Sequence, residues 1–352
     1  MAKVFLKRMK RIIIFTFLVS LLGHTDAVHP QQRKDPPLQK GMSYVTWEKG
    51  DFLSPHSDSS LEDLASTGTK YIAVCPTYYQ KRHNSTRIFS TAQTPSDSGV
   101  RRVIEKARQL GLRVMLKPHI DILEGRSDGY WRADIGFTSD EDWQKWFAEY
   151  DSFITHYALL AESTGVELFC VGTELVFTAQ KLQQWKHIIQ KVRNLYNGEL
   201  IYAANWDNYR NIGFWDDLDY VGIDAYFPLT YRPNPSVTEI VRGWEKWKQQ
   251  IRAWHKGYPK PIIFTEIGYA STTTAPMYPW EGGNHGNADL AVQANCYKAF
   301  FETIWGCSWL RGVYWWRWDT SVHAGGKHNR QFTPQNKPAL QILEKYFKQN
   351  AN

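Results

Sequence analysis

The sequence is poor in cysteine, and its few cysteines suggest no special chemistry. There are four among 352 residues: Cys75, Cys170, Cys296 and Cys307. None has the spacing of a metal site or the local pattern of a catalytic thiol. Cys75 and Cys170 lie in apolar, strand-like runs and are expected to be buried thiols, whereas Cys296 and Cys307 would stand about 16 Å apart on one helix, too far to bond. The sequence therefore predicts no metal site, and no cofactor motif is present.

Two other classes of partner also lack support. No glycine-rich phosphate loop follows the first predicted strand, which continues instead as Trp47-Glu48-Lys49-Gly50, so nucleotide binding is not expected. The net charge is +7, but residues 1–27 carry +4 of it and leave about +3 for the remainder. No tract rich in lysine or arginine follows, which argues against nucleic-acid binding.

Long apolar runs are absent too, apart from one at the amino terminus. Residues 12–22 are apolar and follow a basic segment that ends at Arg11, and Thr25 and Ala27 are small residues at positions preferred by signal peptidase. Residues 1–27 are therefore predicted to be a signal peptide. An uncleaved signal anchor is the alternative. With cleavage we expect a secreted, extracellular protein that has no further contact with the membrane.

Beyond this segment the chain divides into a linker and one large domain. Residues 28–40 are rich in proline, glutamine and lysine and are predicted to be the linker, and residues 41–349 are predicted to form the large domain. Within that domain Asn84-Ser85-Thr86 is an acceptable glycosylation sequon, whereas Asn234 is followed by proline, so we expect a glycoprotein.

Strand-like and helical patterns alternate through the domain. The clearest helical pattern covers residues 140–164, with Ser139 as its N-cap and Gly165 at its end. Eight strands alternating with helices predict a single (β/α)8 barrel, with a doubly wound open sheet as the alternative. The strands are expected near 42–47, 70–76, 112–117, 166–173, 200–205, 219–225, 261–266 and 312–318, and further helices near 97–110, 179–196, 237–255, 288–305 and 335–348.

Two of these apolar segments end in a glutamate. Val171-Gly172-Thr173 is followed by Glu174, and Ile263-Phe264-Thr265 by Glu266. Side chains at the carboxyl ends of strands in a parallel barrel point into the catalytic mouth. Cleavage of a glycosidic bond requires two such carboxylates, one as a proton donor and one as a nucleophile or base. The alternative is that each glutamate is a solvated strand end or half of a structural ion pair.

Aromatic and hydrogen-bonding residues crowd the ends of the other predicted strands. Any one of them could simply serve packing, but together they are what an extended polyhydroxylated ligand would require. Either Trp316 or Trp318 is expected to form the floor beneath the sugar at the cleavage point. The predicted substrate-binding residues are Trp47, Tyr78, Lys117, His119, Asn205, Tyr226, Trp316 and Trp318.

At these positions the chain resembles glycoside hydrolase family 113, the β-1,4-mannanases of clan A. The resemblance covers about residues 41–346. It rests on Pro76-Thr77-Tyr78-Tyr79, Leu116-Lys117-Pro118-His119, Trp131-Arg132, Val171-Gly172-Thr173-Glu174-Leu175 and Thr265-Glu266-Ile267-Gly268-Tyr269.

The resemblance implies that Glu174 is the acid/base and Glu266 the nucleophile of a retaining, endo-acting enzyme that needs no cofactor. Many clan members place asparagine directly before the acid/base, where this chain has Thr173. Asn205 and His119 are therefore the candidates for binding the sugar 2-hydroxyl.

The charges of the two glutamates should differ. Glu266 has to be ionised, with Tyr226 and Arg317 as expected neighbours, whereas Glu174 has to hold its proton and should have a raised pKa. Two alternatives remain: a clan-A enzyme for another β-glycan (glucan, xylan or galactan), and a catalytically inactive carbohydrate-binding relative. The expected partner is a polysaccharide or oligosaccharide, and the expected state is a monomer.

Overall fold

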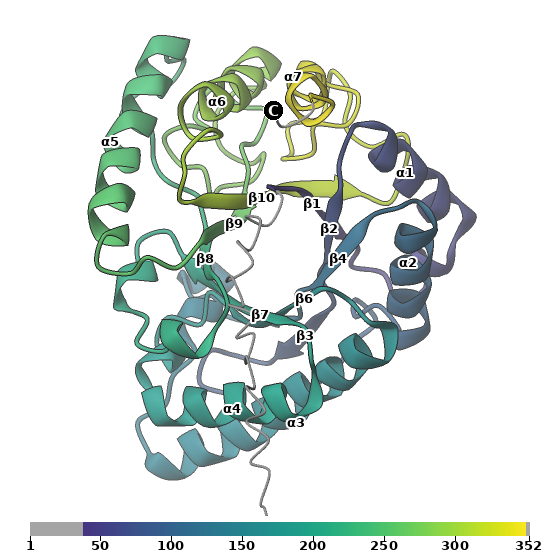
Figure 1. Cartoon of the computed structure of the whole chain (residues 1–352), viewed down its shortest axis with the longest axis vertical. Coiled ribbons are helices and arrows are strands. Elements are labelled where there is room, and N and C mark those ends of the chain that lie inside the picture. Colours follow the sequence, from purple (N-terminus) through teal and green to yellow (C-terminus); the bar gives the residue numbers. More distant parts are fainter. Residues whose placement is uncertain (1–37, 350–352) are drawn as a thin grey trace, which may run out of the picture. The chain divides into compact units, whose positions relative to one another are not determined.

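The computed structural model describes residues 38–349, which contain a closed barrel of eight parallel strands surrounded by helices (Figure 1). All eight predicted strands are present, and the (β/α)8 prediction is confirmed. In order around the barrel they are β1 (Gln39–Val45), β10 (Leu310–Asp319), β9 (Ile262–Ile267), β8 (Val221–Asp224), β7 (Glu199–Asn205), β6 (Leu168–Thr173), β4 (Arg113–Leu116) and β2 (Tyr71–Val74).

The helices outside the barrel include one that the sequence patterns did not indicate, α1. It begins after Ser54, whose side chain accepts a hydrogen bond from the Ser57 amide. The remaining helices fall where they were expected. The full set is α1 (Pro55–Ser66), α2 (Asp97–Gln109), α3 (Asp140–Thr164), α4 (Leu182–Leu195), α5 (Val237–His255), α6 (Leu290–Thr303) and α7 (Pro338–Phe347).

The predicted ends of α3 are confirmed. The Ser139 side chain accepts a hydrogen bond from the Asp142 amide, and Gly165 ends the helix in the left-handed conformation with φ of 63°. Among residues 38–349, no helix is long and apolar enough to cross a membrane.

The predicted signal peptide lies outside the described residues, as does most of the predicted linker. Strand β1 begins at Gln39 and so takes in the last two residues assigned to that linker. Asn84, the predicted glycosylation site, lies in an exposed turn.

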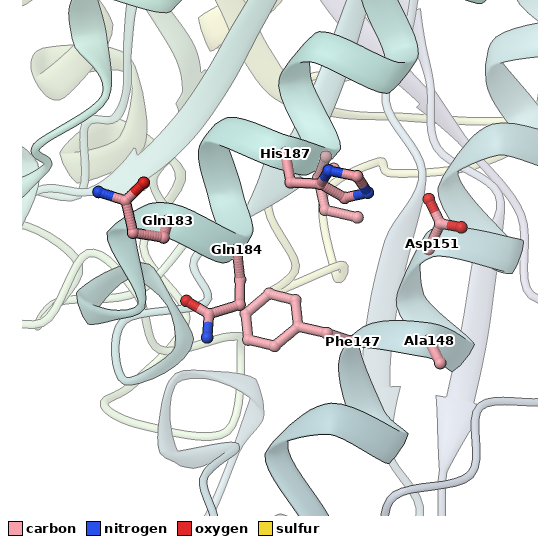
Figure 2. Close-up of a pocket in the computed structure, with 7 residues that line it drawn as sticks. Phe147, Ala148, Asp151, Gln183, Gln184 and His187 are labelled. Carbon is pink, nitrogen blue, oxygen red and sulfur yellow. The ribbon is translucent and has the colours of Figure 1, made fainter. Parts of the chain in front are cut away.

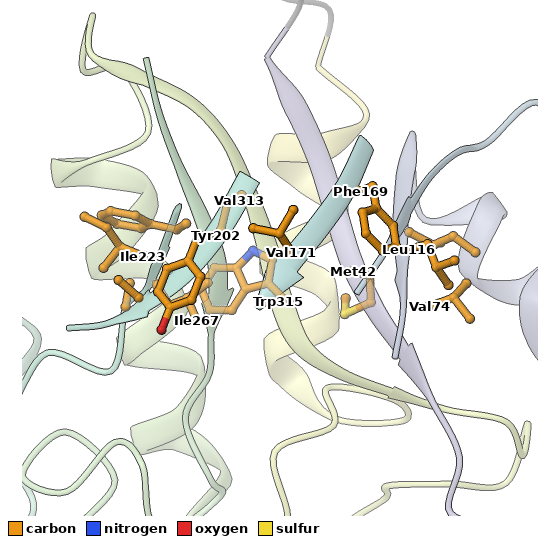
Figure 3. Close-up of a cluster of buried hydrophobic side chains, with 14 of the residues drawn as sticks. Met42, Val74, Leu116, Phe169, Val171, Tyr202, Ile223, Ile267, Val313 and Trp315 are labelled. Atoms are coloured by element: carbon orange, nitrogen blue, oxygen red, sulfur yellow. The ribbon is translucent and has the colours of Figure 1, made fainter. Parts of the chain in front are cut away.

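Alternate residues of each strand face the barrel interior and the helical layer. Figure 3 shows the outward set, to which nearly every strand contributes, among them Met42, Val74, Leu116 and Phe169. The inward set fills the barrel below the site with Tyr71, Ala73, Cys75, Met115, Leu168, Cys170, Ile201, Ala203, Tyr220, Ile263 and Tyr314. Cys75 and Cys170 are thus buried as expected.

Three strands carry a bulge close to the carboxyl end of the barrel. In β6 the pairing with β7 shifts by one residue between Cys170 and Thr173. In β9 the pairing with β8 shifts after Phe264, so that Asp224 of β8 pairs with Glu266. In β10 the pairing with β1 shifts between Trp315 and Trp318. A bulge adds one residue and turns the following side chains, which is why bulges concentrate beside functional sites.

A small feature absent from the predictions is a second, two-stranded parallel sheet. It consists of β3 (Thr77–Gln80) and β5 (His119–Ile122), which extend the chain just beyond β2 and β4. It fixes the positions of His119 and Asp121 above the barrel mouth.

Candidate active site

A cavity of about 920 Å³ lies at the carboxyl ends of the barrel strands. Both predicted catalytic glutamates line it, and they are almost fully buried, with exposed fractions of 7% for Glu174 and 4% for Glu266. Five of the eight predicted substrate-binding residues also line it: Trp47, His119, Asn205, Tyr226 and Trp316.

Glu266 is surrounded by donors and a cation. Lys117 Nζ forms a short ion pair with its Oε1, and the Tyr226 hydroxyl donates to its Oε2 at 2.6 Å. Both oxygens of Glu266 are therefore held by donors from two different strand ends.

Asp224 completes a buried charge cluster behind Glu266. Its carboxylate lies 3.3 Å from Lys117 Nζ and accepts a hydrogen bond of 2.7 Å from Thr265 Oγ1, at the bulge of β9. Burial, together with the nearby Glu266 carboxylate, raises the pKa of Asp224 to about 7. Burial by itself disfavours the Lys117 ammonium, but Asp224 and Glu266 outweigh it and raise the pKa of Lys117.

We predict that Lys117→Met lowers the free energy of unfolding by about 3–5 kcal/mol, because it leaves two adjacent buried carboxylates without their cation. Carboxyl groups with a raised native pKa destabilise the fold as pH rises through that pKa, since the native state then loses the protons it favours. The decrease in the free energy of unfolding of Lys117→Met, measured by chemical denaturation, should therefore be larger at pH 8 than at pH 5. Lys145→Met, at an exposed ion pair with Glu141, should leave the free energy of unfolding nearly unchanged at both pH values, because exposed ion pairs are screened by water. An equal, small effect of both substitutions would contradict a structural role for the buried cluster.

Glu174 follows β6 with a backbone φ of 55°, a conformation that residues other than glycine rarely adopt. Its amide donates to Ala203 O at 2.8 Å, which ties it to β7. Burial and the nearby Asp224 raise its pKa well above the usual range, against the opposing effect of Arg132, and Glu266 adds to the rise. Glu174 therefore favours its protonated form, as a general acid should.

His119 presents an unused polar atom to this cavity. Its Nε2 is buried and forms no hydrogen bond with any residue that the structure describes, and it lies 3.8 Å from Glu266 Oε1. Burial and the cations Lys117 and Arg132 lower the pKa of His119 well below its usual value, so the ring is neutral. Asn205 ends β7, and it too lines the cavity. Both are therefore placed to contact a ligand in the cavity.

Trp316 lies against His119, with nearly parallel rings whose centroids are 6.0 Å apart. Trp47 and Trp316 form a T-shaped pair whose ring centroids are 6.4 Å apart. Trp316 is thus the tryptophan of β10 that faces the cavity.

Trp318 does not share that position, which corrects its predicted substrate contact. Residues two apart on a regular strand face the same side, but the bulge in β10 separates the two rings. The Trp318 indole is 2% exposed and donates to Ser60 on α1.

Three further expectations require correction. Tyr78 does not line the cavity, because β3 turns its ring onto Phe153 and Tyr157 of α3. Lys117 is fully buried behind Glu266, out of reach of a substrate. Arg317, an expected neighbour of Glu266, instead pairs with Asp319 at 2.7 Å and lies over the Trp47 ring.

Several cavity residues were not among the predicted substrate-binding residues. Thr77 and Asp121 lie in β3 and β5, and Trp206 and Asp207 directly follow β7, whereas most of the rest lie in loops away from the strand ends. Arg132 belongs to a short 3-10 helix, η3 (Arg132–Asp134), and its Nη1 lies 3.3 Å from Glu174 Oε2. The Trp131-Arg132 pair was visible in the sequence, but nothing local connected it to Glu174. The others are Thr77, Asp121, Arg126, Gly129, Tyr130, Trp131, Trp206, Asp207, Trp280, Glu281, Asn284 and Phe332.

A second depression, of about 430 Å³, lies between α3 and α4 (Figure 2). Phe147, Asp151, Gln184 and His187 are among its lining residues, and neither of the two predicted catalytic glutamates is. No group of three or more His, Cys, Asp or Glu residues suited to a metal ion occurs within residues 38–349.

Comparison with known proteins gives a consistent result. The model of Glycoside Hydrolase Family 113 matches residues 42–337. A solved complex of a GH113 β-1,4-mannanase is 27% identical, with a TM-score of 0.80 over 89% of this chain and 100% of the other. The GH113 β-mannanase from Alicyclobacillus acidocaldarius, in complex with ManMIm, is 26% identical, with a TM-score of 0.80 over 89% and 98%.

More distant structures share the fold. A β-glucuronidase from Ruminococcus gnavus is 12% identical, with a TM-score of 0.58 over 89% of this chain and 50% of the other. A search of curated proteins found no match.

Proposed function

Because the chain belongs to glycoside hydrolase family 113, we propose that it is a retaining, endo-acting β-1,4-mannanase that cleaves mannan or glucomannan. The observation that carries the proposal is the pair of buried glutamates in one cavity with opposite surroundings. Glu266 is held by a lysine and a tyrosine hydroxyl, whereas burial and nearby carboxylates favour protonated Glu174.

In the proposed reaction Glu266 attacks the anomeric carbon while Glu174 protonates the departing glycosidic oxygen. The product of this step is a glycosyl ester of Glu266. Glu174, now a carboxylate, removes a proton from water as the water oxygen attacks the same carbon and Glu266 leaves. Two inversions give net retention.

The proposed group for the 2-hydroxyl follows from the unused atoms of the site. Thr173 stands where many clan members have asparagine, and its side chain lies within the barrel, against Cys170 Sγ at 3.8 Å. The proposed groups are His119 Nε2, which forms no hydrogen bond to any residue within 38–349, and the side-chain amide of Asn205, which lines the cavity.

The cavity supports a polymeric substrate in two respects. Its volume of about 920 Å³ is near the upper end of the roughly 300–1,000 Å³ typical of small-molecule sites. Its wall includes Trp206 and Trp280, which stack at 5.7 Å with an interplanar angle of 8°. Trp280 is 45% exposed and so offers a free ring face to a sugar.

We expect Trp280→Ala to raise KM for mannan about 2- to 10-fold, the equivalent of roughly 0.5–1.5 kcal/mol of lost stacking. Tyr258→Ala is the matched control, because Tyr258 is 43% exposed but stacks on Trp254 of α5, away from the cavity. Steady-state kinetics on mannan measure both. The same KM for both variants would remove Trp280 from the proposed binding surface.

Substrate choice is tested by incubating the protein with mannan, glucomannan, cellulose, xylan and galactan and resolving the products by size. Internal cleavage of mannan into oligosaccharides supports the proposal. Preferential cleavage of another polymer would establish the runner-up, a clan-A enzyme for a different β-glycan. No cleavage of any polymer would favour an inactive carbohydrate-binding protein.

We also propose that the protein is secreted as a monomer after loss of residues 1–27. The support is the order of basic, apolar and small residues in that segment. Amino-terminal sequencing of protein from the culture medium tests cleavage, and its elution volume in size-exclusion chromatography tests the monomer. Recovery only in membranes with Met1 retained would favour the signal anchor.

A further inference from the structure

Glu174 has one cation within ion-pair distance among the described residues, Arg132. Its Nη1 lies 3.3 Å from Glu174 Oε2, and its Nη2 lies 3.5 Å from Asp121 Oδ2. The guanidinium thus bridges the acid/base and a second carboxylate. A cation beside a general acid is unexpected, because it favours loss of the proton that the acid has to donate.

The surroundings hold Arg132 firmly in this place. The Trp131 amide donates to Asp134 Oδ2 at 3.0 Å, which closes η3. The Phe177 amide donates to Ala133 O at 3.1 Å, which ties η3 to the segment after Glu174. The Arg132 side chain is 15% exposed. The arrangement is therefore built into the fold and does not depend on a flexible surface side chain.

The charges that face Glu174 come from several elements, and only one of them changes during the reaction. Asp224 and Glu266 favour the protonated form, whereas Arg132 and Lys117 favour the carboxylate. The hydroxyls of Tyr202 and Tyr226 also lie near. Formation of the glycosyl ester removes the negative charge of Glu266, while Asp224 remains paired with Lys117. The charges around Glu174 then favour its carboxylate form more strongly than they did before the ester formed.

We propose that Arg132 is a positioning residue for the second half of the reaction. Once Glu266 is esterified, its guanidinium holds Glu174 as the carboxylate that accepts a proton from water. Without this partner, a buried carboxylate would be costly. Asp121, whose Oδ2 also pairs with Arg126, offsets part of the Arg132 charge, so that Glu174 still holds its proton in the first step. The inference rests on the proposed glycosidase function.

The step balances in atoms and charge. The water oxygen forms a bond to the anomeric carbon as the bond from that carbon to the Glu266 oxygen breaks. Glu266 departs as a carboxylate, and the water proton passes to Glu174. Arg132 exchanges no proton, so its contribution is to the ionisation state and orientation of Glu174.

The test uses 2,4-dinitrophenyl β-mannobioside, whose leaving group needs no proton, so hydrolysis of the glycosyl-enzyme limits turnover. Arg132→Met should release the first equivalent of dinitrophenol at a rate within about 3-fold of the original protein. Its steady-state rate should be lower by about 10- to 1,000-fold, since a neighbouring opposite charge changes a carboxyl pKa by about 1–3 units. Azide, which needs no general base, should restore much of this rate.

The pH dependence gives a readout that a merely structural role would not change. The second step requires ionised Glu174, so the steady-state rate rises with pH through the pKa of Glu174 in the intermediate. Removal of Arg132 raises the pKa of Glu174 in the intermediate and should move the increase of the steady-state rate to higher pH. Arg132→Lys keeps the positive charge and should move this increase part of the way back toward the pH of the original protein. Asp121→Asn should act in the opposite direction, moving the loss of activity on mannan at alkaline pH to a lower pH.

Arg82→Met is the control, because Arg82 is an exposed arginine that pairs with Glu124. An equal slowing of the first and second steps by Arg132→Met, or no rescue by azide, would overturn the proposal. The proposal would also be overturned if Arg132→Met released dinitrophenol with the same kinetics as the original protein. Failure of the original protein to release any would instead contradict the proposed function.

Discussion

Replacement of Glu266 by alanine should reduce turnover on every glycoside by about 10⁴-fold or more, the scale of loss when a covalent nucleophile is removed. The physical reason is that no ester can form, so the first step has no productive path. Initial rates on mannan and on 2,4-dinitrophenyl β-mannobioside measure the effect. Glu199→Ala, at the amino end of β7, should keep its turnover within about 3-fold, because it lies at the opposite end of the barrel from the site.

Azide should rescue Glu266→Ala in a diagnostic way. The small anion can occupy the space of the lost carboxylate and attack the activated β-mannobioside once. A single inversion yields the α-glycosyl azide. Formation of the β-azide by this variant would assign the nucleophile to another residue, and undiminished cleavage of mannan would remove Glu266 from the mechanism.

Replacement of Glu174 by alanine should separate substrates according to their leaving groups. Activity on mannan should fall about 10²- to 10⁴-fold, the usual contribution of general acid–base catalysis. The first step on the dinitrophenyl substrate should persist, because dinitrophenolate departs without protonation. Added azide should accelerate the slow second step and give the β-azide through two inversions.

The pH profile should support the same role. In the original protein, kcat/KM on mannan should fall as pH rises through the raised pKa of Glu174, because the acid then loses its proton. This alkaline loss should be absent from Glu174→Gln assayed on the dinitrophenyl substrate. Exchange of the azide products between Glu174→Ala and Glu266→Ala would require the two roles to be exchanged.

The fold could be predicted from the sequence because each strand is a short apolar run and most helices carry a clear periodic pattern. The strands β3 and β5 could not be predicted from the sequence. Their residues, such as Thr77 and His119, were assigned to the ends of β2 and β4, since no local pattern separates a strand from a short extension paired above the barrel. Helix α1 was missed because its sequence, which contains Ser57, Asp58, Ser59 and Ser60, lacks an apolar face of helical period.

The positions of the two glutamates were predictable because a charged side chain at the carboxyl end of a buried barrel strand points into the mouth of the barrel. The direction of individual side chains was less predictable. Trp316 and Trp318 are separated by a bulge, and Lys117 lies beneath the cavity floor because Asp224 and Glu266 bind it there. These outcomes depend on pairing across strands and on contacts between distant segments, as does the contact of Arg132 with Glu174. The local sequence predicts neither the pairing across strands nor the contacts between distant segments.

We propose that Glu174 and Glu266 together cleave β-1,4-mannosidic bonds with retention. The most direct test is to hydrolyse mannohexaose in an NMR tube and observe the anomeric proton of the newly released reducing ends before mutarotation. The proposed mechanism predicts cleavage at internal bonds with the β-anomer appearing first and the α-anomer following slowly. Initial appearance of the α-anomer, or no cleavage of mannohexaose at all, would contradict it.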